Sequence, residues 1–294
     1  MRGSGKAHVA IFLVNIIYGL NYLVSKGVMP QFLAPSAFIL LRILFTATLA
    51  LTWWFFSDFE TIKRRHGLRF ILCALTGVAI NQLCFFEGLN LTTPAHAAVI
   101  FTVNPALTLA ASWILEKEKI HKVQGIGLLF SMLGALGLAF FSKGNLTWDN
   151  MFLMGDLLIF INALSYAFYL PLVRPLLQHY KPISILSINF LLGSLLVLPF
   201  GITPLMEVNF ENIPLLIWIK ILYVLFAVTF ITYLLSIYGL KRLTPFQVSI
   251  YVYVQPILAS FLDIVCRGFK PDFVFVASSA AVLIGVWLAV NRKN

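Results

Sequence analysis

Polar side chains recur at helical spacing inside stretches that are otherwise apolar. Two triplets, each of one asparagine and two tyrosines three or four residues apart, would share one side of a helix. They are Asn15, Tyr18 and Tyr22, and Asn162, Tyr166 and Tyr169. Tyrosine rings offer apolar area and stacking, and amides fix orientation through hydrogen bonds. These residue types therefore predict a site that binds a small amphipathic solute.

Further polar residues lie at matching places in other apolar stretches and extend the same predicted wall. They are Gln82, His96, Asn104, Tyr233, Gln247, Tyr251 and Gln255. A polar group in hydrocarbon is costly unless it meets a partner or a wet cavity, which favours a lined central cavity. The alternative is that these groups hydrogen-bond packed helices to one another, each bond being worth about 0.6–2 kcal/mol.

The elements that position these residues are membrane-spanning helices. Of 294 residues, 60% are hydrophobic and only 11% are charged, and the mean hydropathy is +0.93. Soluble domains carry about 25% charged residues. Long apolar stretches with short polar gaps predict an all-α membrane protein with ten transmembrane helices. The predicted helices are 7–25, 35–56, 68–88, 94–114, 122–141, 152–172, 183–203, 214–239, 245–265 and 273–290.

The placement of lysine and arginine predicts the orientation of the helices. With the N-terminus in the cytoplasm, fifteen of the 21 Lys and Arg residues fall on the inner side and four on the outer side, while Arg42 and Lys220 fall within helices. This asymmetry follows the positive-inside rule, and it predicts that the N- and C-termini are both cytoplasmic. Basic residues at helix ends also account for the net charge of +10 without a nucleic-acid partner.

The two halves of the chain are similar to each other. An offset of 151 residues aligns 83–107 with 234–258, with Thr-Pro and Gly-Leu pairs and a mid-helix proline in common. We therefore predict two five-helix repeats, 1–141 and 152–294. Because five is odd, the second repeat enters the membrane inverted, as in secondary transporters that work by alternating access. The alternative is a duplicated bundle with a purely structural role.

Two intramembrane charges and two prolines have predicted roles in gating. Arg42 is predicted to be an outer-gate residue or an anchor for a solute carboxylate, and the alternative is a static ion pair with Glu87. Pro105 and Pro256 each remove a main-chain hydrogen bond in mid-helix, so they are predicted hinges or simple kinks.

Other titratable residues in the predicted helices have milder expected roles. Asp156 and Asp263 lie near predicted outer helix ends, where we expect them to be solvated. His96 could carry a coupled proton, but a single intramembrane histidine is more often simply hydrogen-bonded.

The predicted helices 122–141 and 273–290 differ from the rest because small residues recur in them every four positions. These residues are Gly127, Ser131, Ala135 and Ala139, and Ala277, Ala281, Gly285 and Ala289. Such spacing allows close helix packing, and the low polarity predicts helices peripheral to the cavity. The spacing leaves open whether they pack within one chain or form a homodimer.

Several short motifs follow one another along the chain. They are Tyr18-Gly19-Leu20-Asn21-Tyr22 with Lys26, Pro35 with Arg42, Asn104-Pro105, and Glu118-Lys119 with Gln124 and Gly127. Together they resemble the drug/metabolite transporter superfamily, of the EamA type, over essentially the whole chain. The second half departs from the pattern, since Phe269 stands where Glu118 does in the first. The resemblance implies export or exchange of small metabolites, amino acids among them.

Other classes of function have weaker support. The sequence has no Walker-type phosphate loop, so the predicted transporter is secondary-active or an exchanger. The five histidines are scattered, which predicts no enzyme, no metal site and no cofactor. The alternatives are an importer or antiporter of a sugar, nucleoside or organic acid, or a channel-like or structural membrane protein. Short loops favour a bacterial inner (plasma) membrane, and the expected partners are the lipid bilayer and a small-molecule solute.

Overall fold

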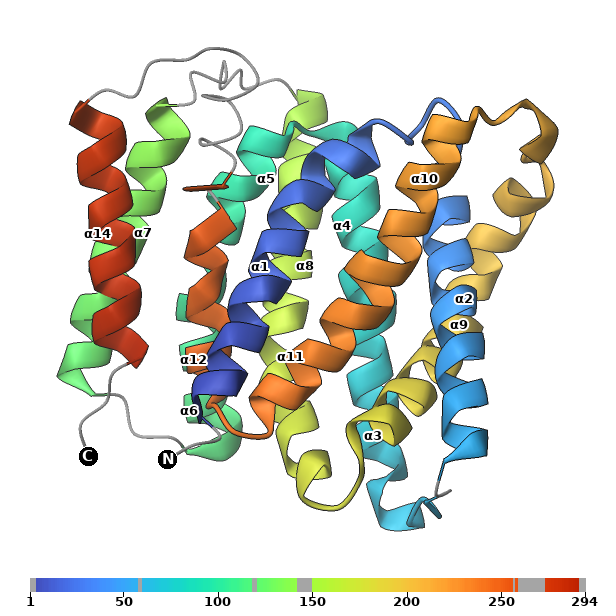
Figure 1. Ribbon diagram of the computed structural model, residues 1–294, viewed down its shortest axis with the longest axis horizontal. Helices are drawn as coiled ribbons and strands as arrows, with labels where there is room; N and C mark the ends of the chain where they lie inside the picture. Colours follow the sequence, from blue (N-terminus) through green and yellow to red (C-terminus); the bar gives the residue numbers. More distant parts are fainter. Residues whose placement is uncertain are drawn as a thin grey trace.

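The computed structural model describes residues 4–57, 60–117, 121–141, 150–255, 257–258 and 273–290, and in this part the chain is helical with no strands (Figure 1). Seven described segments are long and apolar enough to cross a membrane, and two shorter apolar helices lie at 122–137 and 276–290. The predicted all-α architecture is therefore confirmed. The ten-helix count stays a prediction, because most of 256–272 lies outside the described residues.

Several predicted spans consist of two or three helical segments in succession. In chain order the described elements are α1 (Ser4–Lys26), α2 (Pro35–Phe56), η1 (Arg64–His66), α3 (Gly67–Ala74), η2 (Leu75–Ala79), α4 (Ile80–Leu91), α5 (Pro94–Phe101), α6 (Asn104–Glu116), α7 (Lys122–Phe141), α8 (Asn150–Val173), η3 (Arg174–Gln178), α9 (Pro182–Met206), η4 (Phe210–Asn212), α10 (Leu215–Tyr223), η5 (Val224–Ile231), α11 (Thr232–Leu240), α12 (Pro245–Ser249), η6 (Ile250–Tyr253) and α14 (Phe273–Val290).

The large apolar side chains face both inward and outward. Fully buried residues such as Phe38 and Phe190 form one core between the helices, while Phe56 is 82% exposed and Leu195 is 62% exposed. A soluble protein rarely exposes so many large apolar side chains, whereas a helix in lipid needs them. The outer surface of the bundle therefore has the character expected at a lipid interface.

Close contacts between pairs of helices hold the centre of the bundle together. The helix α2 packs along α9, and α4 packs along α8. Small residues make the second contact possible, because a Cβ at Gly88 would lie 2.9 Å from the Gly155 carbonyl oxygen. The helix α1 runs through the middle of the bundle beside α11 (Figure 1).

Two spans contain a stretch of π-helix at equivalent positions. The segment η2 interrupts the span from α3 to α4, and η5 interrupts the span from α10 to α11. An offset of 151 residues places 75–79 onto 226–230, inside η5. π-Helical turns are uncommon and often occur at functional sites, so these two interruptions point to the region between them.

The helices α7 and α14 pack against each other within the chain, side by side at the left of Figure 1. Their glycines meet main chain directly: a Cβ at Gly127 would lie 2.6 Å from the Gly285 carbonyl oxygen and 2.7 Å from the Ala289 nitrogen. The small-residue spacing is thus used for packing inside one chain. A homodimer stays a prediction.

Enlarging Gly127 should separate α7 from α14. We expect Gly127→Leu to lower the melting temperature of the detergent-purified protein by roughly 5 °C, because overpacking costs about 1–3 kcal/mol. Gly125→Leu is the matched control on the same helix, since nothing lies within 4 Å of a Cβ there. Equal melting temperatures for the two variants would contradict the close contact.

Candidate substrate-binding cavity

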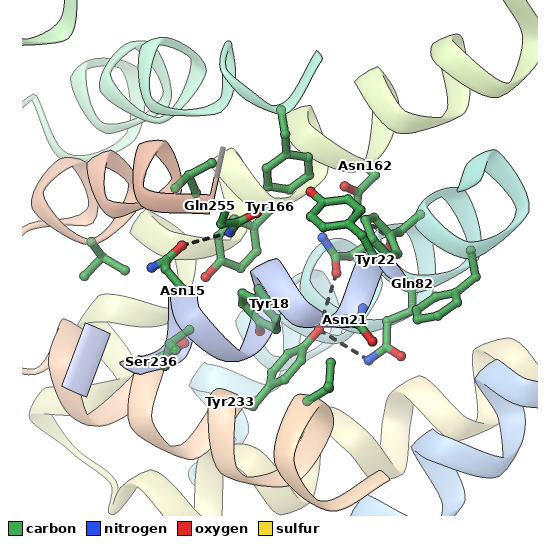
Figure 2. Close-up of a pocket in the computed structure, with 18 of the residues that line it drawn as sticks. Asn15, Tyr18, Asn21, Tyr22, Gln82, Asn162, Tyr166, Tyr233, Ser236 and Gln255 are labelled. Atoms are coloured by element: carbon green, nitrogen blue, oxygen red, sulfur yellow. Dashed lines mark hydrogen bonds between the residues drawn. The ribbon is translucent and has the colours of Figure 1, made fainter. Parts of the chain in front are cut away.

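A cavity with a volume of about 80 Å³ lies at the centre of the bundle. Its wall comes from α1, α2, α4, α5, α8, η5, α11, α12 and η6, and from Gln255, which follows η6 (Figure 2). Tyrosines, amides and phenylalanines dominate the wall. A polar and aromatic surface of this kind suits a solute with an apolar body and hydrogen-bonding groups.

Most of the residues predicted to line a cavity do so. The structure places these predicted residues in the cavity wall: Asn15, Tyr18, Tyr22, Arg42, Gln82, Asn162, Tyr166, Tyr233 and Gln255. The predicted binding residues that lie outside the lining are His96, Asn104, Tyr169, Gln247 and Tyr251, and Glu87, predicted to gate, is also outside it. The helical spacing of Asn15, Tyr18 and Tyr22 is what identified the face of α1 that points inward.

A hydrogen bond joins α1 to the end of the α12–η6 span. Gln255 Nε2 donates to Asn15 Oδ1 at 2.9 Å, and Asn15 Nδ2 donates to the Ile11 carbonyl at 2.9 Å (Figure 2). Both side chains are buried. This contact links residues 240 positions apart in the chain and closes one side of the cavity.

Main-chain carbonyls around η2 accept hydrogen bonds from three surrounding side chains. Tyr233 Oη donates to the Gly77 carbonyl at 2.8 Å, Asn162 Nδ2 donates to the Asn81 carbonyl at 2.6 Å, and Ser165 donates to the Thr76 carbonyl. A π-helix displaces carbonyls from the regular i→i+4 pattern, which makes them accessible to other donors. The interruption in this span thereby holds two cavity residues, Asn162 and Tyr233, in place.

Arg42 lies in the cavity wall and is 3% exposed. Its Nε donates to Thr229 Oγ1 at 2.9 Å, and its Cζ lies 4.2 Å from the centroid of the Phe86 ring. Thr229 lies in η5 and donates in turn to the Val224 carbonyl, five residues earlier, at 2.8 Å. A hydrogen bond to Thr229 in η5 and a cation–π contact with Phe86 in α4 therefore hold the guanidinium in place.

The alternative of a static ion pair between Arg42 and Glu87 is wrong. Within the described residues the salt bridges are His96–Asp156 and Arg174–Glu116, and Glu87 is only half-buried outside the cavity lining. The two side chains lie on α2 and α4, where their depths along the helices suggested a pair. Phe86, the neighbour of Glu87, is instead the residue that contacts the guanidinium.

The expectation that Asp156 is solvated is also wrong. Its Oδ2 lies 2.9 Å from His96 Nδ1, its Oδ1 accepts from Thr92 Oγ1 at 2.6 Å, and the two side chains of the ion pair are 12% and 4% exposed. His96 is accordingly bonded to a carboxylate between α5 and α8. Asp263 lies outside the described residues.

Tyr169 is buried with its ring against Gly77, and three further predicted residues outside the lining form hydrogen bonds between helices. Asn104 Nδ2 donates to the Ala163 carbonyl at 2.8 Å, and Gln247 forms a capping box with Thr244 while its Nε2 donates to the Val290 carbonyl at 3.1 Å. Tyr251 Oη lies 2.9 Å from His8 Nδ1. For these three residues the alternative of interhelical bonds applies.

Three polar lining residues were absent from the sequence-based set. Asn21, Asn81 and Ser236 all line the cavity. Asn21 falls within the motif that carries the family resemblance, and Asn81 precedes Gln82, so both had a signal in the sequence. The faces of Asn81 and Ser236 cannot be assigned by helical spacing alone, because each follows a π-helical segment that changes the rotation of later residues. Asn21 lies in the regular helix α1, three residues after Tyr18, so its spacing did indicate the cavity face.

The predicted hinge at Pro105 lies beside a break in the helix. The helix α5 ends at Phe101, a turn covers Thr102 and Val103, and α6 restarts at Asn104 with the proline in its first turn. Tyr253 Oη donates to the freed Thr102 carbonyl at 2.7 Å. Pro256 lies outside the described residues, although the 3₁₀ segment η6 precedes it.

The sequence matches the pattern of the EamA-like transporter family twice, over residues 5–140 and 153–291. The chain belongs to the EamA-like transporter family. The resemblance to the drug/metabolite transporter superfamily is thereby confirmed, and the chain is a multi-pass membrane transporter and not an enzyme.

Named relatives of this family member extend over its full length. It is 24% identical to the uncharacterized transporter YetK of Bacillus subtilis over 98% of this chain and 88% of that protein. It is 24% identical to an uncharacterized transporter of Archaeoglobus fulgidus over 99% of both chains. A protein of known crystal structure has the same fold, with a TM-score of 0.77 and 16% identity over 97% of this chain and 96% of the other.

The buried pair of His96 and Asp156 should contribute more to stability than the more exposed pair of Arg174 and Glu116. We expect Asp156→Ala to lower the free energy of unfolding by about 2 kcal/mol, because it leaves His96 and Thr92 without their carboxylate. Glu116→Ala should cost under about 1 kcal/mol, since Arg174 is 35% exposed. Thermal unfolding in one detergent compares the two variants, and equal losses would contradict the burial argument.

Proposed function

We propose that this EamA-family protein is a secondary transporter, an exporter or exchanger, that moves a small organic solute through the central cavity by alternating access. The observation that carries the proposal is the position of the cavity. It lies at mid-helix, both halves of the chain line it, and hydrogen bonds hold its polar groups in place. A binding site enclosed between two halves is what a carrier needs in order to expose a solute to one side at a time.

The two halves, 1–141 and 152–294, are proposed to be inverted repeats. The double match of the family pattern supports this, as do the two π-helical segments 151 residues apart. A further support comes from three hydrogen bonds that each join residues 151 positions apart: Gln82 to Tyr233, Ser131 to Val282, and Tyr253 to Thr102. Equivalent residues of two units touch each other where they lie on the two-fold axis that relates the units.

The same contacts suggest which parts move. Asn15–Gln255 and His8–Tyr251 connect α1 of the first half to the α12–η6 region of the second. Opening the cavity at this end requires breaking both hydrogen bonds. The helix break at Thr102–Val103 gives the first half a place to bend without disturbing a regular helix.

Orientation and location complete the proposal. The lysine and arginine asymmetry supports cytoplasmic termini, with the tyrosine and amide cavity accessible alternately from both sides. We propose a bacterial inner membrane, amino acids among the solutes, and a homodimer formed through outer lipid-facing helices. An importer or antiporter of a sugar or nucleoside uses the same geometry with another solute.

Cavity substitutions should abolish flux while leaving the protein folded. In proteoliposomes loaded with an unlabelled amino-acid mixture, we expect saturable counterflow of labelled amino acid, reduced at least about tenfold by Tyr22→Ala or Gln255→Ala. The reason is that each removes a wall group from the site that orients the solute. The control is Leu195→Ala, a change on an outward face that is 62% exposed.

The kinetics separate a carrier from a channel. Flux that rises linearly with solute concentration, or flux unaffected by both cavity variants in well-folded protein, contradicts alternating access through this cavity. Saturable flux of a sugar or nucleoside in place of amino acids keeps the transporter and changes its solute class.

A further inference from the structure

The cavity contains one unusual charge. Among the described residues that line it, Arg42 carries the only formal charge, and the lining includes no aspartate or glutamate. The Nη1 atom of Arg42 is buried and has no hydrogen-bond acceptor in the described part of the protein. The clamp of Thr229 and Phe86 fixes the guanidinium but does not neutralise it.

An uncompensated guanidinium among apolar helices is unfavourable, so residues of this kind pair or mark a binding function. If this position served only helix packing, a neutral side chain or an arginine in an ion pair would be sufficient. Arg42 has no ion pair in the described residues, and its planar fork of donors matches a carboxylate in geometry. A carboxylate group on the solute can therefore supply the negative charge that Arg42 lacks.

Two other polar atoms of the cavity wall lack a hydrogen-bond donor in the part of the chain that the structure describes. Gln82 Oε1 and Asn162 Oδ1 are buried acceptors without a donor among the described residues. Their orientations follow from the bonding network: Asn162 uses its Nδ2 on a carbonyl, and Gln82 donates to Tyr233 Oη, whose own proton goes to the Gly77 carbonyl. Both amide oxygens therefore lack a donor in this conformation of the described chain.

We propose that the cavity binds an organic carboxylate that also carries a hydrogen-bond donor, with the carboxylate on Arg42 and the donor facing Gln82 and Asn162. The rings of Tyr22 and Phe85, whose centroids are 5.6 Å apart, supply area for the apolar body of the solute. This assignment rests on the proposed transport function and names the chemical class of the transported solute.

The first test uses the unmodified protein. Purified protein is titrated with amino, hydroxy and aryl-alkyl carboxylates, each paired with its primary carboxamide, and binding is followed by the rise in melting temperature. We expect saturable binding of one or more acids and affinity weaker by roughly 10- to 100-fold for the matching amide, the range for a charged hydrogen-bonded pair. Amides that bind as tightly as their acids, or a panel with no acid bound, overturn the assignment.

The second test changes the arginine. Arg42→Gln should weaken acid binding by roughly 10- to 100-fold and leave the weak binding of the amides within about twofold. Its solute-free melting temperature should be at or above that of the unmodified protein, because an unneutralised buried charge has been removed. Arg42→Lys, which keeps the charge but loses the planar fork, should bind acids with intermediate affinity.

Arg174→Gln is the matched control, since Arg174 pairs with Glu116 outside the cavity. It should leave acid affinity unchanged. A lowered melting temperature for Arg42→Gln together with unchanged acid affinity would show a purely structural arginine and overturn the proposal.

Combining binding with counterflow distinguishes this assignment from the proposed function. If the protein binds no acid but shows counterflow of a sugar or nucleoside, the proposed transport function stands and the carboxylate site is refuted. Arg42-dependent acid binding without counterflow of any bound acid retains the carboxylate site and refutes transport.

Discussion

Buried polar groups determine the interior of this protein, because lipid and apolar side chains offer them no hydrogen bonds. Many of these polar side chains form hydrogen bonds with main-chain carbonyls: Asn104 donates to the Ala163 carbonyl and Tyr253 donates to the Thr102 carbonyl. Several of these bonds use carbonyls near helix interruptions, such as those of Gly77 and Thr102. The π-helical segments and the break before α6 are thus where the bundle can accommodate polarity, and the cavity lies between them.

The interruptions also explain why the cavity draws on both halves of the chain. The segment η2 provides the carbonyl of Gly77 for Tyr233 from the second half, and η5 provides Thr229 for Arg42 from the first. Each half therefore orients a wall residue of the other. These contacts between the halves hold only while the two halves keep their present positions relative to each other. Movement of one half against the other would therefore change the cavity wall. In a carrier, this property couples solute binding to the change of access.

The sequence predicted the helices and the inward face of α1 well, because both depend on local periodicity. Asn15, Tyr18 and Tyr22 share a face in any regular helix, and they line the cavity as expected. Contacts between helices were harder to predict. The pairing of His96 with Asp156 depends on how deeply α5 and α8 sit against each other, and that depth depends on close packing at glycines such as Gly155. The pairing of Arg42 with Glu87 was wrong for a related reason. The depth of a residue along its helix does not determine which way its side chain faces around the helix axis.

Arg42 illustrates how a binding site departs from the most stable arrangement. Every other described cavity residue is neutral, and Thr229 of the π-helical segment η5 and the ring of Phe86 hold the one cation in place. Stability alone would favour an apolar residue of similar volume, because a buried charge without a partner is destabilising by several kcal/mol. An arginine maintained at such expense is best explained by a ligand that neutralises it during part of the transport cycle. Binding of the proposed carboxylate would neutralise the guanidinium, and in an alternating-access carrier that change would favour different conformations before and after solute release.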